Sequence, residues 1–123
     1  MESSHPIIDK TAEKKVFSLY QLNKSIKNTL ESKTGNASFW VRAEIAKITV
    51  SRTGHAYLDL VEEVNGVQQA AIKGNIWRST FEKIKKELGG SSESVLQVGS
   101  EIVFKCSVSF HEVHGLSLLI DAI

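Results

Sequence analysis

Aromatic and basic side chains gather in the middle of the chain, in a pattern that suits phosphates and bases. In residues 52–60, Tyr57 and His55 share one parity, and Arg52 lies in the turn signal before them. Binding a nucleic-acid strand requires cations along its backbone and flat side chains on which bases stack, and each stacked base contributes about 1–3 kcal/mol. We therefore predict that Tyr57 is a stacking platform with His55 beside it, and that Arg52 reaches a phosphate.

Six further residues complete the candidate nucleic-acid-binding set. They are basic, amide-bearing or aromatic side chains on either side of residues 52–60, namely Arg42, Lys47, Lys73, Asn75, Trp77 and Arg78. Lys73 would contact a phosphate, or else it is a solvated surface lysine. The aromatic residues have alternatives too, because Tyr57 could pack on a neighbouring strand and Trp77 could fill a core or an interface. Trp40 is expected to pack.

Residues that could catalyse a reaction or hold a metal are few. His111 and His114 are close in sequence, but no cysteine or third histidine stands beside them to complete the tetrahedral set that zinc requires. The sequence shows no glycine-rich phosphate loop and no Ser, His and Asp set that can be placed together. We predict no catalytic residue, no metal and no cofactor within this chain.

The overall composition is that of one ordinary globular domain. Of 123 residues, 41% are hydrophobic and 24% are charged, so a real core can form. The net charge is only +1, so a polyanion would have to be bound by a local patch. The single cysteine, Cys106, is expected to be buried on a strand. Without a secretory signal pattern or a run of roughly 18 apolar residues, a cytoplasmic protein without membrane contact is predicted.

The elements that must position these residues begin after a polar segment. Residues 1–16 show no sustained period and are expected to form a flexible arm, followed by one domain at 17–123. Ser18 opens a capping-box pattern. Apolar residues then recur at helical spacing, at Leu19, Leu22, Ile26 and Leu30. The pattern predicts an amphipathic helix that ends near Lys33 and keeps its polar face, which includes Lys27, in solvent.

Five stretches alternate apolar and polar residues as strands do. They are Phe39–Val50, 55–60, 67–74, Glu101–His111 and 116–123. In the first, the apolar parity switches after Ile45, which indicates a bulged or strongly coiled strand. A second capping-box pattern at Ser79 predicts a short helix that stops at Gly89, followed by a flexible polar loop at 90–94.

Five strands with a helix between the third and the fourth follow the order of the five-stranded Greek-key barrel called the OB-fold. The predicted fold class is therefore mainly β, an OB-fold barrel with an N-terminal helix and a short helix between strands 3 and 4. The parity switch favours a closed barrel, whose first strand must serve two parts of a curved sheet. The alternative is an open α+β sheet covered by two helices.

Four segments, in order, resemble the N-terminal domain of the large subunit of bacterial exodeoxyribonuclease VII. They are FSLYQLN at 17–23, WVRAEI at 40–45, GHAYLDL at 54–60 and AAIKGN at 70–75. The resemblance covers roughly residues 17–123, with two departures. Ala43 stands where the family usually has glycine, and the last hairpin carries EVHG at 112–115 in place of Pro, Arg and Gly. The second departure weakens the case that this loop grips phosphate.

The resemblance implies an OB-fold domain ahead of a long helical catalytic region, in an enzyme that degrades single-stranded DNA to oligonucleotides and contains a small subunit. The expected partners are single-stranded DNA, that catalytic region and that small subunit, while cleavage would lie outside this chain. An alternative is a protein interaction or assembly module that exposes Trp40, Trp77 and Leu119 to the rest of the enzyme. Oligosaccharide binding rests on the fold alone.

Overall fold

The computed structural model describes residues 7–9, 14–35 and 37–123, and it divides the chain into two units. One is Met1–Asn36 with Phe110–Gly115, and the other is Ala37–Ser109 with Leu116–Ile123. In the first unit, β1 (Ile7–Asp9) and β2 (Lys14–Val16) form an antiparallel pair that the sequence analysis did not predict. The rest of the predicted arm, residues 1–6 and 10–13, lies outside the described residues.

The helix α1 (Leu19–Thr34) begins as the sequence predicts. Ser18 Oγ accepts a hydrogen bond from the Gln21 N–H at 3.0 Å, and Gln21 Oε1 accepts one from the Ser18 N–H at 2.9 Å. These reciprocal bonds satisfy N–H groups that a helix start leaves without backbone partners. The helix ends at Gly35, whose N–H donates to the Glu31 carbonyl at 2.7 Å. Both predicted ends are confirmed to within a residue or two.

The polar side of α1 does not simply face solvent. Asn23 Nδ2 donates to the Glu112 carbonyl at 2.8 Å, and Lys27 Nζ lies 3.6 Å from Glu112 Oε2. Both contacts join the helix to the hairpin tip at Phe110–Gly115, within the same unit. The expectation that Lys27 is only solvated was therefore wrong. The apolar stripe of the helix is left exposed instead, at Leu19, Leu22 and Ile26.

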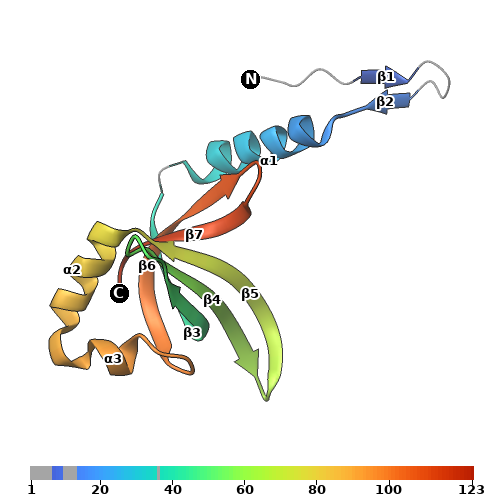
Figure 1. The fold of residues 1–123 in the computed structure, drawn as a ribbon. Coiled ribbons are helices and arrows are strands. Elements are labelled where there is room, and N and C mark those ends of the chain that lie inside the picture. Colours follow the sequence, from blue (N-terminus) through green and yellow to red (C-terminus); the bar gives the residue numbers. More distant parts are fainter. Residues whose placement is uncertain (1–6, 10–13, 36) are drawn as a thin grey trace. The chain divides into compact units, whose positions relative to one another are not determined.

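Five strands close into a barrel (Figure 1). They are β3 (Phe39–Val50), β4 (Ala56–Val64), β5 (Val67–Ile76), β6 (Glu101–His111) and β7 (Gly115–Ala122), in the order β3-β4-β5-β7-β6. β3 pairs antiparallel with both β4 and β6, which closes the barrel, and β5 runs parallel to β7. The predicted OB-fold is confirmed, and the open-sheet alternative was wrong.

A bulge in β3 explains why its apolar parity switches. The pairing with β4 shifts between Ile45 and Lys47, so Ala46 is an extra residue. Ile45 is buried opposite Leu60 before the shift, and Ile48 packs against the core after it. An extra residue moves the inward position by one and bends the strand. One strand can thereby line both parts of the barrel, as the parity switch predicted.

Between β5 and β6 lies the predicted helix, α2 (Arg78–Leu88), together with elements that were not predicted. The helix begins directly after Trp77, so the predicted capping box at Ser79 was wrong because Ser79 lies inside the first turn. The loop expected at 90–94 was also wrong. It contains parts of the 3-10 turn η1 (Gly89–Ser91) and of α3 (Ser92–Val95).

One apolar core fills the barrel and extends to α2. Its buried members are Ile45, Ala56, Leu58, Leu60, Ile76, Phe81, Ile84, Ile102, Phe104, Cys106, Leu118 and Ile120. The buried position of Cys106 on β6 is as predicted. Burial raises the pKa of this thiol above its ordinary value, and the charge of Asp121 raises it further. A buried thiol with a raised pKa is a poor nucleophile, so Cys106 acts as a small core side chain.

Candidate nucleic-acid interface

The outer surface of β3, β4 and β5 carries two rows of side chains. Residues that pair directly across antiparallel strands point to the same side of the sheet. One row is Thr49, Tyr57 and Asn75, and the next is Lys47, Asp59 and Lys73. Leu58 and Leu60, which alternate with these positions on β4, are buried, so both rows face outward. We call these six residues the strand face.

Tyr57 stands in the middle strand of the face. Tyr57 is 41% exposed, whereas its neighbours Ala56 and Leu58 are buried. The alternation predicted for this strand is thereby confirmed, and the ring is directed outward. On the neighbouring strand, Asn75 Nδ2 donates to Ser117 Oγ of β7 at 3.3 Å. The amide opposite Tyr57 is therefore anchored, while the tyrosine ring is open to a ligand.

Lys73 is paired with a residue that the sequence analysis did not consider. Its Nζ lies 2.7 Å from Asp59 Oδ1, directly across the β4–β5 pair. The side chains are 71% and 36% exposed, respectively. An ion pair this exposed contributes only about 0–1 kcal/mol, so a phosphate can exchange for the carboxylate. Asp59 could have been found from the sequence, because it shares the outward parity of Tyr57.

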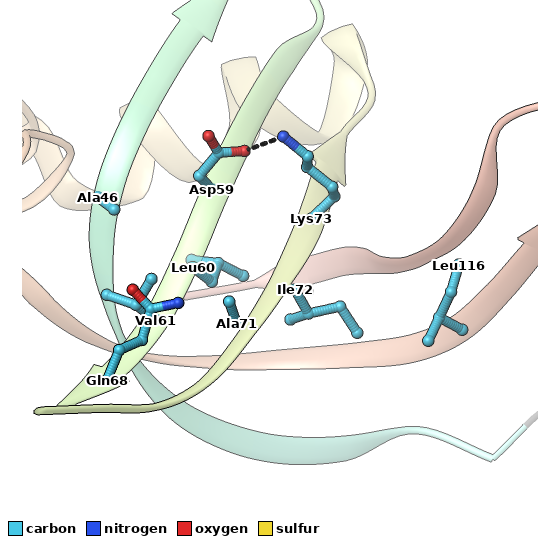
Figure 2. A pocket seen from close by; sticks show the side chains of 9 residues that line it. All are labelled: Ala46, Asp59, Leu60, Val61, Gln68, Ala71, Ile72, Lys73 and Leu116. Atoms are coloured by element: carbon cyan, nitrogen blue, oxygen red, sulfur yellow. Dashed lines mark hydrogen bonds and ion pairs between the residues drawn. The ribbon is translucent and has the colours of Figure 1, made fainter.

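A hollow of about 560 Å³ opens beside this ion pair (Figure 2). Small and branched apolar side chains form most of its lining, which is Ala46, Leu60, Val61, Ala71, Ile72 and Leu116 with Asp59, Gln68 and Lys73. Asp59 and Lys73 lie together on one side of it, and Gln68 lies on another (Figure 2). The bulge in β3 supplies Ala46 to this surface. Asp59 and Lys73 belong both to the strand face and to the lining of the hollow, so the two adjoin.

His55 has a structural role that the sequence analysis missed. Its Nδ1 accepts a hydrogen bond of 2.9 Å from the Arg78 N–H, at the first residue of α2. Its ring also meets the Trp77 ring edge-on, with 5.1 Å between centroids and 83° between planes. Trp77 is the N-cap residue of α2 but makes no capping hydrogen bond with its side chain. His55, in the turn between β3 and β4, supplies the capping acceptor instead. The structure brings these three predicted site residues together at the start of α2.

The other predicted residues lie in separate places. Lys47 is exposed in the strand face, and Arg52 is exposed in the turn that precedes β4. Arg42 lies on β3 before the bulge, opposite Val103 of β6, and so belongs to a different part of the surface. Trp40, expected to pack, is 59% exposed. The structure therefore joins the lysines of the face with Tyr57 but not with Arg42.

His111 organises the turn of the last hairpin. His111 Nδ1 accepts hydrogen bonds from the N–H groups of Val113 and His114, at 3.0 and 3.3 Å. The neighbouring residue Glu112 has a carboxyl group whose pKa is lowered, chiefly by a hydrogen bond from the backbone of Glu112 itself. Burial acts in the opposite direction and raises this pKa, whereas the positive charge of Lys27 lowers it further. Among the described residues, no group of three His, Cys, Asp or Glu side chains is arranged to hold a metal ion.

Comparison with known proteins decides the family. Residues 17–123 match the model of the OB-fold nucleic acid binding domain. The chain belongs to this family. It is similar to an exodeoxyribonuclease 7 large subunit from Rhodopirellula baltica, with 35% identity over 97 residues, which are 79% of this chain and 20% of the relative. A large subunit from Helicobacter hepaticus is 38% identical over 84 residues, which are 68% of this chain and 18% of that relative.

These relatives confirm the resemblance to exodeoxyribonuclease VII large subunits, and the chain spans about a fifth of the length of the curated relatives it matches. Among solved structures, an aspartyl tRNA synthetase from Entamoeba histolytica aligns with a TM-score of 0.52 and 13% identity, covering 79% of this chain and 20% of that one. At this identity the likeness supports the fold alone. Within the described part of the OB-fold domain, the helices are too short or too polar to span a membrane.

Proposed function

We propose that this OB-fold domain binds single-stranded DNA in an exodeoxyribonuclease VII large subunit, with the strand face as the contact surface. The observation that carries the proposal is the pair of adjacent rows on one exposed surface, with Tyr57 in one row and Lys47 and Lys73 in the next. β4 and β5 are the second and third strands of the barrel, and these strands form the ligand-binding face of OB-folds in general.

In this proposal, a base stacks on Tyr57 while phosphates meet Lys47 and Lys73. Strands lie about 4.8 Å apart, so the two lysines, on either side of β4, stand roughly 10 Å from each other. Lys73 exchanges the Asp59 carboxylate for a phosphate, at little cost because the ion pair is exposed. Arg52 in the preceding turn extends the path of positive charge. Contacts of these kinds hold the strand without reading its sequence.

The role of the domain in the enzyme is to hold the strand while the chemistry occurs elsewhere. The relatives are about five times as long as the matched segment, which leaves room for a separate catalytic region. We assign hydrolysis of DNA to that region and not to this chain, and we expect the small subunit to be a further partner. The cytoplasm, where DNA is accessible, is the expected location.

Fluorescence anisotropy with a labelled single strand at low salt tests the proposal. Tyr57→Ala is expected to weaken binding by about 5- to 150-fold, which corresponds to the loss of about 1–3 kcal/mol from one stacked base. Tyr20→Ala is the matched control, because Tyr20 is also an exposed tyrosine, 61% exposed, but lies at the start of α1. If the single strand does not bind while duplex DNA does, the proposal fails.

A second candidate function, assembly with other parts of the enzyme, is favoured by the surface of α1. Leu19, Leu22 and Ile26 lie along one stripe of the helix and are 72%, 49% and 37% exposed. An exposed apolar stripe commonly marks an interface with another protein. Leu19→Glu combined with Leu22→Glu would then reduce association with the catalytic region or the small subunit in size-exclusion chromatography, and would leave DNA affinity unchanged. Tyr57→Ala with Lys73→Ala should give the reverse result.

A further inference from the structure

We infer that the hollow beside Asp59 receives a nucleobase, and that Asp59 makes the strand face prefer bases with an exocyclic amino group, such as cytosine, over thymine. The inference rests on the proposed function, since it assigns a base preference to the same surface. It adds a specificity that stacking and phosphate contacts alone do not supply.

The position of the hollow suits the base next to the one on Tyr57. Residues two apart on a strand point to the same side and lie about 6.6 Å apart, so Asp59 stands directly beyond Tyr57 on the outer surface. The hollow continues from Asp59 along the same two strands, over Val61 on β4 and Ala71 on β5. A strand that lies along the face therefore presents one base to the ring and a neighbouring base to the hollow.

The lining of the hollow suits a flat, largely apolar object. Its volume of about 560 Å³ lies within the roughly 300–1,000 Å³ typical of small-ligand sites. Ala46, Val61 and Ala71 leave room above the strands because none of them has a long side chain. Ala46 occupies this place only because of the bulge in β3, and bulges often re-aim side chains beside binding sites. Gln68 offers an amide at the rim.

The chemistry of the rim decides which base is favoured. An ionised carboxylate can only accept hydrogen bonds, and its usual partner among pyrimidine edges is the N4 amino group of cytosine. Thymine presents the O4 acceptor at the equivalent position and would repel the carboxylate. When Lys73 turns to a phosphate, Asp59 loses the cation that lies 2.7 Å away. An amino group of the incoming base replaces that lost partner, whereas thymine leaves the carboxylate without one.

Two pyrimidine homopolymers of equal length, oligo-dC and oligo-dT, separate this inference from the proposed function. Anisotropy titrations at one low salt concentration should show that the wild-type chain binds oligo-dC about tenfold more tightly than oligo-dT. Asp59→Asn should bring the ratio close to one, because the amide can donate to thymine O4 as well as accept from an amino group. Ala71→Ile, which fills the hollow from an exposed strand position, should also remove the preference.

The matched control is Glu63→Gln, which removes one negative charge from the same strand at a position outside the lining of the hollow. It should leave the dC to dT ratio unchanged. The inference is overturned, with the proposed function intact, if the wild type binds both homopolymers equally, or if Asp59→Asn and Glu63→Gln strengthen both by the same factor. If neither homopolymer binds, the proposed function itself fails. Thermal unfolding of each variant establishes that a lost preference is not lost folding.

Discussion

At the scale of single residues, the turn before β4 connects the strand face to α2. The Ser51 N–H donates to the His55 carbonyl at 2.8 Å, and the His55 N–H donates to Ser51 Oγ at 3.1 Å. The same turn carries Arg52 and leads directly to Tyr57. His55 then caps α2 through its ring. The position of Tyr57, the proposed stacking residue, and the start of the helix therefore depend on one small set of hydrogen bonds.

Replacing the capping histidine should destabilise the domain. His55→Ala removes the acceptor of the Arg78 N–H, and loss of a helix cap costs about 1 kcal/mol. The free energy of unfolding, measured by chemical denaturation, is expected to fall by that amount. Lys83→Ala, at an exposed position of the same helix, serves as the control and should have a much smaller effect. Equal effects of the two substitutions would contradict the capping role.

Gly54 in the same turn should not accept a side chain. Its φ is +92°, and a Cβ atom there would lie 2.8 Å from Arg78 Cγ. A non-glycine residue held in such a conformation costs about 1–3 kcal/mol. Gly54→Ala is thus expected to lower the midpoint of thermal unfolding clearly. Gly90→Ala is the matched comparison, because Gly90 has no positive φ and a Cβ atom added to it would meet nothing within 4 Å. A similar loss in both variants would show that the conformation of Gly54 does not exclude a side chain.

At the scale of elements, strands were easier to predict than the segment between β5 and β6. The alternation around Tyr57 is local, so the sequence reveals which side is buried. The start of α2 depends on His55, which is 23 residues from Arg78, and Ser79 offered a plausible local cap that the fold does not use. Likewise, no local pattern shows that Lys27 contacts a hairpin formed by residues far along the chain. Contacts of this kind require the tertiary structure.

The contact between α1 and the last hairpin should weaken in acid. The pKa of Glu112 is lowered below its ordinary value of 4.5, and the largest cause is a hydrogen bond from its own backbone. The charges of Lys27 and Lys24 also lower this pKa, whereas burial raises it. A lowered pKa in the folded state means that the stabilisation is present above the unfolded pKa and is lost as pH falls through the folded one. Protection of α1 amides from hydrogen exchange is therefore expected to decrease below about pH 4.5.

Glu112→Gln tests this prediction, because it keeps the shape of the side chain and removes the charge. At neutral pH the variant should already show the weaker hydrogen-exchange protection of α1 that the wild type shows in acid. Acidification should then lower the protection of the variant by less than it lowers that of the wild type. Glu31→Gln, an exposed carboxylate on α1, is the comparison and should keep the pH dependence of the wild type. If Glu112→Gln behaves like the wild type at every pH, the carboxylate does not stabilise the contact.

At the scale of the whole molecule, the barrel was predictable because the order of elements nearly determines it. Five alternating stretches, the parity switch after Ile45 and one helix between strands 3 and 4 leave few alternatives to an OB-fold. The distribution of charge was less predictable. The sequence places Lys73 on the face but does not show that Asp59 neutralises it, so the strand face has two lysines and one carboxylate and a local charge of +1.

The small charge of the face leads to a prediction about salt. With a net charge of only +1 on the chain, long-range attraction of DNA is weak, so in the proposed binding mode affinity would depend on the few cations that touch phosphates. Each phosphate contact to a single strand contributes about −0.7 to the slope of log K against log salt concentration. Lys47, Lys73 and Arg52 together should therefore give a slope of about −2, which anisotropy titrations at several sodium chloride concentrations measure.

Removing one cation at a time shows which of them touches a phosphate. Lys73→Ala should make the slope shallower by about 0.7, because one fewer phosphate is neutralised. Lys33→Ala, at an exposed site in the last turn of α1, should not change it. A Lys73→Ala variant that binds less tightly with an unchanged slope would show that Lys73 does not neutralise a phosphate. A far steeper wild-type slope would show instead that the DNA path extends well beyond the strand face, because additional phosphates would then have to be neutralised elsewhere on the protein.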